Sequence, residues 1–382
     1  MNNKIVVIIT ALVVLNILAL YSIRPYGYNF SSMLRIAENE KEGVVPEYFQ
    51  KGFVVFTDGG GYDGQYYYYA SMDPLIRNGL YKNPFRQQRV LYPLVSRALS
   101  FGDVSLLPLA MYATNIVAVV FGMYFFILII GQFGLSPAWS LLYGLSPATI
   151  MTVQYSLPSP LSMALIIAAV YFYMVRENIW TATAIFALAF LTREDTVMVL
   201  APLVLWDFQM KRSFKRGAVL IASLVPFLIW QYYVASRLGS LATVASSSVI
   251  NPVPFAGIVG FLKTLTFGGV KQTLRELSAV VVFVYFMAVA IAVLLALKKK
   301  RHLFYYVTLA YCVLSVFTVP SQWDNFNGLL RMFYGLFPFL VLSYAIEKNI
   351  ALKYCAVFIA GLTFLTAIRI VFISPVFPFK VW

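Results

Sequence analysis

The sequence predicts an all-α polytopic membrane protein, with about eleven transmembrane helices in a single domain over residues 1–382. Hydrophobic residues make up 61% of the chain and charged residues only 12%, and the mean hydropathy is +0.79. Apolar stretches of about twenty residues, the length that crosses a bilayer as a helix, recur from end to end. A soluble chain of this length would normally form two domains, and this composition excludes that class.

Charge and cysteine content support the same class. The net charge is +14, but the basic residues lie in short clusters between apolar stretches, so we expect no nucleic-acid partner. Cys312 and Cys355 both fall inside apolar stretches, which favours small hydrophobic residues over a disulfide.

The first predicted span covers residues 5–22. Its apolar run is longer than a signal-peptide core and is followed by no A-x-A-like cleavage site, so we interpret it as uncleaved. The other ten predicted spans cover residues 104–131, 135–154, 157–175, 179–192, 195–206, 218–235, 277–297, 303–319, 329–346 and 350–373.

Basic residues in short connections set the orientation, because they concentrate on the cytoplasmic side. With eleven spans, the following all lie on the same side as Lys4: Arg176, Lys211, Arg212, Lys215, Arg216, Lys298, Lys299, Lys300, Arg301, Lys348 and Lys353. We therefore expect an integral protein of the plasma (inner) membrane, with a cytoplasmic N-terminus and an active site on the external face.

Residues 179–206 decide this parity. As one helix they would measure roughly 42 Å and carry charges at the centre. As two short antiparallel helices they keep the parity, and each is shorter than the roughly 20 residues of a full crossing. The tip between them, Arg193, Glu194 and Asp195, should then be recessed in the outer leaflet. Charges there are costly unless they face a wet cavity, which makes the tip a functional candidate.

Two segments are long enough to form external loops. Residues 23–103 are polar but rich in aromatic residues, and we expect helices at 65–78, broken near Pro74, and at 92–100. These should lie along the membrane interface, with the run Tyr66–Tyr69 anchoring the first. Residues 236–276 form a second external loop, in which we expect another interfacial helix.

The string from Gly59 to Tyr66, GGGYDGQY, is the most distinctive in the first loop. Its glycines allow the backbone to approach a ligand closely, and Asp63 stands at a turn before a helix. A simple N-cap would explain Asp63 alone, since aspartate is a favoured capping residue.

Arginines form the second group of external residues. Guanidinium groups bind phosphate in a bidentate, permanently charged geometry. For Arg89 and Arg331 we favour a ligand role, whereas Arg97 and Arg369 are equally well explained by snorkelling to lipid headgroups. Asp324 remains open between a site residue and an ordinary loop residue.

One carboxylate beside arginines at a membrane surface suits a sugar donor attached to an isoprenoid lipid through phosphate. Phosphate leaves without protonation, so arginines stabilise its charge and one aspartate accepts the proton of the acceptor hydroxyl. Direct attack inverts the anomeric carbon, and no paired carboxylates at glycosidase spacing are required. The lone histidine, His302, belongs to a cytoplasmic basic cluster.

With these features, the chain resembles the GT-C superfamily of polyprenyl-phosphate-sugar-dependent glycosyltransferases. The string YDGQYYY from Tyr62, followed by RVLYPL from Arg89, is similar to small prokaryotic members described as mannosyltransferases. The string LTRE ending at Glu194 looks like the acidic tip between two middle helices, and Arg331 with Pro338 looks like their R…P segment.

The resemblance implies Asp63 as base, Glu194 as a second acidic residue, and Arg89 and Arg331 as phosphate contacts. Family members often carry adjacent acidic pairs in this loop, whereas here Asp58 and Asp63 are separated, so either remains a candidate base. The complete predicted site is Asp63, Glu194 and Asp58 as catalytic residues; Arg89, Arg331, Arg86 and Arg193 for the donor phosphate; and Tyr62, Gln65, Tyr66 and Asp324 for substrate.

The predicted partners are a polyprenyl-phosphate-sugar donor, a lipid, glycan or protein acceptor, and membrane lipids. No cofactor is expected; oxygen ligands leave Mg²⁺ or Mn²⁺ open, but the arginines already supply positive charge. A transporter or flippase for a lipid-linked or anionic solute is the main alternative, and it predicts midplane charges and repeat symmetry that the sequence lacks. The second alternative is a membrane scaffold or assembly subunit that catalyses no reaction.

Overall fold

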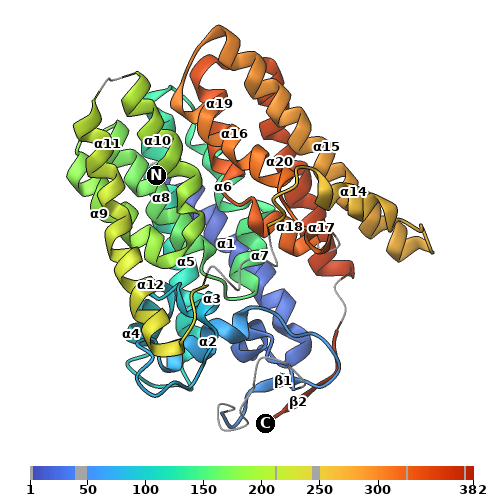
Figure 1. Cartoon of the computed structure of the whole chain (residues 1–382). Coiled ribbons are helices and arrows are strands. Elements are labelled where there is room, and N and C mark those ends of the chain that lie inside the picture. Colours follow the sequence, from blue (N-terminus) through green and yellow to red (C-terminus); the bar gives the residue numbers. More distant parts are fainter. Residues whose placement is uncertain (1–2, 39–49, 211–212, 243–249, 324–325, 374–375) are drawn as a thin grey trace.

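The computed structural model describes residues 3–38, 50–210, 213–242, 250–323, 326–373 and 376–382 (Figure 1). These residues form an almost entirely helical bundle. A smaller lobe with the short helices α2–α4 and the strands lies at its lower end in the view. Within the described residues the strands are β1 (Val54–Phe56) and β2 (Phe379–Val381).

Five helical stretches are long and apolar enough to cross a membrane. They are Asn3–Tyr26 (α1, Asn3–Ile23, with the turn after it), Leu107–Gln132 (α5), Phe214–Leu238 (α11, Phe214–Ile221, and α12, Val225–Leu238), Gln272–Lys299 (within α15, Val270–Lys299) and Ile350–Ile373 (α20, Ile350–Ile368, and the turn after it). Each exceeds the roughly 20 residues that span the hydrocarbon core. They confirm an all-α membrane protein, while the count of eleven crossings stays a prediction.

Shorter apolar helices complete the bundle. Those of the central region are α8 (Ser159–Met174), α9 (Ile179–Thr192), α10 (Val197–Gln209), α16 (Leu303–Val316) and α19 (Leu336–Glu347). Helix α8 packs against α5 and α9, and most of its side chains are buried. The predicted pair of short helices within 179–206 is confirmed, because α9 ends at Thr192 and α10 begins at Val197.

The expected single span at 135–154 is wrong. The chain there forms a 3₁₀ turn (Pro137–Ser140), α6 (Leu141–Gly144) and α7 (Pro147–Gln154). The sequence explains the break at α7: Pro147 lacks the N–H that would continue a helix, and the Ser146 side chain instead caps α7 by accepting from the Thr149 N–H at 3.2 Å.

The segment predicted to form the first external loop folds into α2 (Gly64–Met72), α3 (Pro84–Gln87) and α4 (Leu91–Leu99). Helix α2 ends before Pro74, as predicted, and α4 matches the predicted helix at 92–100. The run Tyr66–Tyr69 is not an interfacial anchor, however: all four side chains are buried. They pack within the lobe, where the Tyr67 ring meets Tyr92 of α4 edge-on at 6.0 Å.

The C-terminal residues return to this lobe. Strand β2 pairs antiparallel with β1, with Val55 opposite Lys380 (Figure 1). Elsewhere, the second external segment holds α14 (Ala256–Lys263), which confirms a helix there; residues 243–249 lie outside the described part. The remaining helices, α17 (Pro320–Trp323) and α18 (Phe326–Met332), lead into α19.

Candidate active site

A cavity of about 760 Å³ opens where α2, α3, the tip between α9 and α10, and α18 converge. Its polar wall carries the four arginines predicted to bind phosphate and two of the three predicted catalytic carboxylates. These are Arg86, Arg89, Arg193 and Arg331 together with Asp63 and Glu194. The cavity therefore brings together residues that are far apart in the chain: Asp63 and Arg331 are 268 positions apart.

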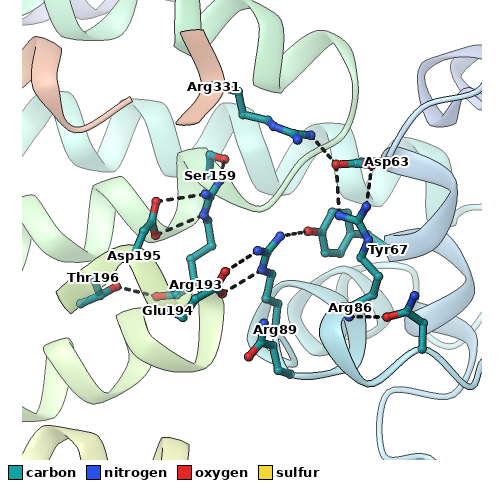
Figure 2. A network of polar contacts seen from close by, with 12 residues as sticks. Asp63, Tyr67, Arg86, Arg89, Ser159, Arg193, Glu194, Asp195, Thr196 and Arg331 are labelled. Atoms are coloured by element: carbon teal, nitrogen blue, oxygen red, sulfur yellow. Dashed lines mark hydrogen bonds and ion pairs between the residues drawn. The ribbon is translucent and has the colours of Figure 1, made fainter. Parts of the chain in front are cut away.

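Asp63 stands at the N-terminus of α2, but its side chain does not cap the helix. Its carboxylate accepts two hydrogen bonds from Arg86, Nη2 to Oδ1 at 2.8 Å and Nη1 to Oδ2 at 3.1 Å, and a further one from Arg331 (Figure 2). The capping explanation is therefore wrong for the side chain, which faces two guanidinium groups that converge from different parts of the chain.

This pairing sets the ionisation of Asp63. Burial alone would raise its pKa, but the charges of Arg331 and Arg86 outweigh burial and hold the pKa well below its usual range. The carboxylate is thus ionised throughout the physiological pH range. Two aromatic rings flank the arginines: Tyr62 lies 5.4 Å from the Arg331 guanidinium and Tyr66 lies 4.9 Å from that of Arg86.

Arg89 forms the second ion pair. Its side chain donates two hydrogen bonds to Glu194, including Nε to Oε2 at 2.9 Å, and a third to the hydroxyl of Tyr67 (Figure 2). Burial would raise the pKa of Glu194, but Arg89 more than offsets it and holds the pKa at about 2. This pair joins the smaller lobe to the tip between α9 and α10.

Arg193 organises that tip. Its backbone is extended, with φ −158° and ψ 136°, which ends α9 and turns the chain. Its side chain donates to Asp195, Nε to Oδ1 at 3.2 Å, and to the Ser159 hydroxyl.

Two other predicted site residues, Asp58 and Gln65, do not line the cavity. Asp58 is exposed and does not line the cavity. Gln65 is buried, and its side-chain oxygen accepts a hydrogen bond from the Ala37 N–H at 3.1 Å, so its visible role is to hold the lobe together. Asp324 lies outside the described residues.

The glycines of the predicted loop do not approach the cavity either. A Cβ at Gly60 would meet Phe377 and Phe56 at 3.0 Å, and one at Gly64 would lie 2.5 Å from the backbone oxygen of Tyr155. Gly60 therefore allows close packing against Phe377 of the C-terminal segment, and Gly64 allows close packing against the backbone of Tyr155. Their close packing fixes the turn that carries Asp63. Direct contact between these glycines and a ligand, as expected from the sequence, is not supported, because none of them lines the cavity.

Two side chains that accept hydrogen bonds from the guanidinium groups of the site were not predicted from the sequence. Tyr67 lies four positions after Asp63, so both fall on one face of a helix, and this spacing was a usable signal. Ser159, which binds Arg193, carries no such signal, because only the packing of α8 beside the tip brings it there.

Another part of the cavity lining is apolar. It includes Val197 and Met198 of α10, Phe227 and Leu228 of α12, and Leu314 of α16. Leu228 is 59% exposed and Val197 39%, and α12 belongs to a helix long and apolar enough to cross a membrane. The cavity lining is therefore amphiphilic: it combines ionised side chains with apolar side chains, and two of the apolar ones are also exposed at the surface.

The fold and site define a membrane-embedded, all-α protein with a charged cavity between its bundle and the smaller lobe. Comparison of the chain with models of protein families, with curated proteins and with solved structures finds no match.

Proposed function

We propose that the protein is an integral membrane glycosyltransferase that moves a hexose, with mannose as the first candidate, from a polyprenyl-phosphate donor to a lipid, glycan or protein acceptor. The reaction takes place on the external face and inverts the anomeric carbon. No resident metal takes part in this proposal, because the arginines supply the positive charge that the phosphate requires.

The composition of this cavity supports the proposal most strongly. A phosphate fits between Arg331 and Arg86, which already converge on one anionic group, the Asp63 carboxylate. An isoprenoid chain fits the apolar wall and leaves it past Leu228 toward lipid. A ligand that satisfies both walls has an anionic head and a long apolar tail.

The transfer step follows from these positions. The acceptor hydroxyl oxygen attacks the anomeric carbon while its proton passes to the Asp63 carboxylate. The bond between that carbon and the phosphate oxygen breaks, and its electron pair leaves on the phosphate. Arg331 and Arg86 neutralise the charge that develops there.

Donor binding also frees the base. In the absence of donor, both arginines bind Asp63, which keeps it a weak proton acceptor. A donor phosphate that competes for the same guanidinium groups releases the carboxylate and lets its pKa rise, since burial then acts with less opposition. Asp63 becomes reactive only when the leaving group is in place.

A donor panel tests this function. The purified protein in nanodiscs is given radiolabelled polyprenyl-phosphate sugars, with and without a crude acceptor extract, and release of sugar from lipid is followed. Release from one donor, dependent on extract, supports a transferase. Saturable donor binding without release under any condition, together with donor movement across proteoliposome membranes, would replace it with a flippase.

A further inference from the structure

A second groove lies at the C-terminal end of α15, and none of the residues that line the candidate active site lines it. It measures about 670 Å³ and is formed by the last turns of α15, the residues that follow, and the first turn of α16. Ile291, Leu294, Leu295 and Lys298 of α15 line it, with Arg301 and Tyr306 opposite.

The groove has an apolar part followed by a cationic part toward the end of α15. Ile291, Leu294 and Leu295 are 59%, 47% and 53% exposed, and they lie on one face of a helix long and apolar enough to cross a membrane. Lys298 and Arg301 are exposed at its end, and neither forms an ion pair with a carboxylate among the described residues. The apolar strip from residue 291 to 298 is about 10 Å long.

We propose that this groove binds an anionic phospholipid. The acyl chain lies along the strip of Ile291, Leu294 and Leu295, and the phosphate is held between Lys298 and Arg301. Charge complementarity favours this occupant, since basic groups beside membrane helices attract anionic headgroups. The site differs from the candidate active site in residues and in position, and it does not depend on the proposed transferase activity.

The side chains must supply the affinity. The groove lies at the C-terminus of α15, where the helix dipole repels anions, so the backbone opposes the phosphate. Removing the two charges should therefore strongly reduce selectivity for anionic lipid, because Lys298 and Arg301 are the cationic side chains that line the groove.

Lys299 and Lys300 provide a matched control. They belong to the same basic run and are equally exposed, but neither lines the groove. A general attraction of the run for an anionic membrane would depend on all four charges. A site built by the groove depends on Lys298 and Arg301 alone.

The test uses photoactivatable phosphatidylglycerol and phosphatidylcholine with identical chains, each in nanodiscs with the full-length protein, followed by mapping of the labelled peptide. We expect labelling of residues 291–306 by phosphatidylglycerol only. It should fall roughly 10-fold in Lys298→Gln/Arg301→Gln and less than about 2-fold in Lys299→Gln/Lys300→Gln. Excess unlabelled phosphatidylglycerol should compete, and free glycerol phosphate should not.

Three outcomes would overturn the proposal. Equal labelling by phosphatidylcholine would show a surface without headgroup preference, and an equal loss in both double variants would show general attraction. Competition by glycerol phosphate would show a site for a free phosphate. All four positions are exposed, and a fall in phosphatidylglycerol labelling of the unsubstituted protein with rising salt gives a check that needs no variant.

Discussion

The carboxylate of Asp63 and the guanidinium groups of Arg86 and Arg331 neutralise one another in the cavity wall. Each group is largely shielded from water, with the side chain of Asp63 16% exposed and that of Arg86 15%. Shielded charges of this kind bind a competing ion strongly when it offers equivalent hydrogen bonds. At the residue scale, the proposed function therefore depends on an exchange of partners between carboxylate and phosphate.

Replacing Arg331 by Gln should weaken donor binding. The change removes a charge-assisted hydrogen bond to phosphate worth about 1.5–3 kcal/mol, which corresponds to roughly 10- to 150-fold in dissociation constant. Equilibrium binding of a labelled donor measures this directly. Arg77→Gln, an exposed arginine of the same external segment that lies off the cavity, should leave affinity unchanged. Equal affinities in the two variants would remove Arg331 from the phosphate site.

The pH dependence of activity should report the ionisation of Asp63. A base loses activity as pH falls through its pKa, and here the pKa lies below its ordinary value of 3.8. The rate at subsaturating donor should therefore show no loss attributable to Asp63 between pH 7 and pH 5. In Arg86→Gln one opposing charge is gone, so the pKa rises and the acid limb moves to higher pH. An acid limb that stays in place would contradict the assignment of Asp63.

At the scale of elements, the pair Arg89–Glu194 joins the connection between α3 and α4 to the tip between α9 and α10. A double-mutant cycle with Arg89→Gln and Glu194→Gln should give a coupling free energy of about 1–3 kcal/mol, measured as stability in detergent. Glu194 is 35% exposed, so the value should lie below that of a fully buried pair. A coupling near zero would mean that the contact does not fasten the two elements.

The turn that leads into α2 depends on a close approach of backbones. A Cβ at Gly64 would lie 2.5 Å from the Tyr155 oxygen and 2.9 Å from that of Leu34, and backbone atoms cannot yield as side-chain ends do. Gly64→Ala should therefore displace Asp63 and lower both melting temperature and turnover. Gly131→Ala, within α5 and with open space around the Cβ, is the control and should keep both. Equal melting temperatures and turnover in the two variants would contradict the close contact between Gly64 and the backbone of Tyr155.

The sequence predicted the elements that local composition specifies better than those that depend on tertiary packing. Hydrophobic runs predicted α5, α9 and α20 within a few residues, since membrane helices are specified by local composition. The break at 135–154 and the burial of Tyr66–Tyr69 are consequences of tertiary packing and had weaker local signals. Asp58 and Asp63 could not be told apart, because both flank the same glycines. Only the folded turn directs Asp63 to Arg331 and leaves Asp58 exposed.

At the scale of the whole molecule, the distribution of basic residues predicts that residues 23–103 lie outside the cell. Single cysteines in a variant lacking Cys312 and Cys355 can be labelled with a membrane-impermeant reagent in intact cells. Asp58→Cys, in the external segment, should be labelled without permeabilisation, and Lys299→Cys, in the basic run, only after it. The reverse pattern would place the cavity on the cytoplasmic face and remove the proposed external reaction.

The most direct test of the central claim compares Asp63→Asn with Asp58→Asn in donor binding and in sugar transfer. The account predicts that Asp63→Asn abolishes transfer while donor still binds, because the amide retains the shape of the carboxylate but cannot accept the proton. Asp58→Asn, an equivalent change on an exposed residue of the same segment, should transfer at the unsubstituted rate. Transfer preserved in Asp63→Asn, or lost only in Asp58→Asn, would contradict the account.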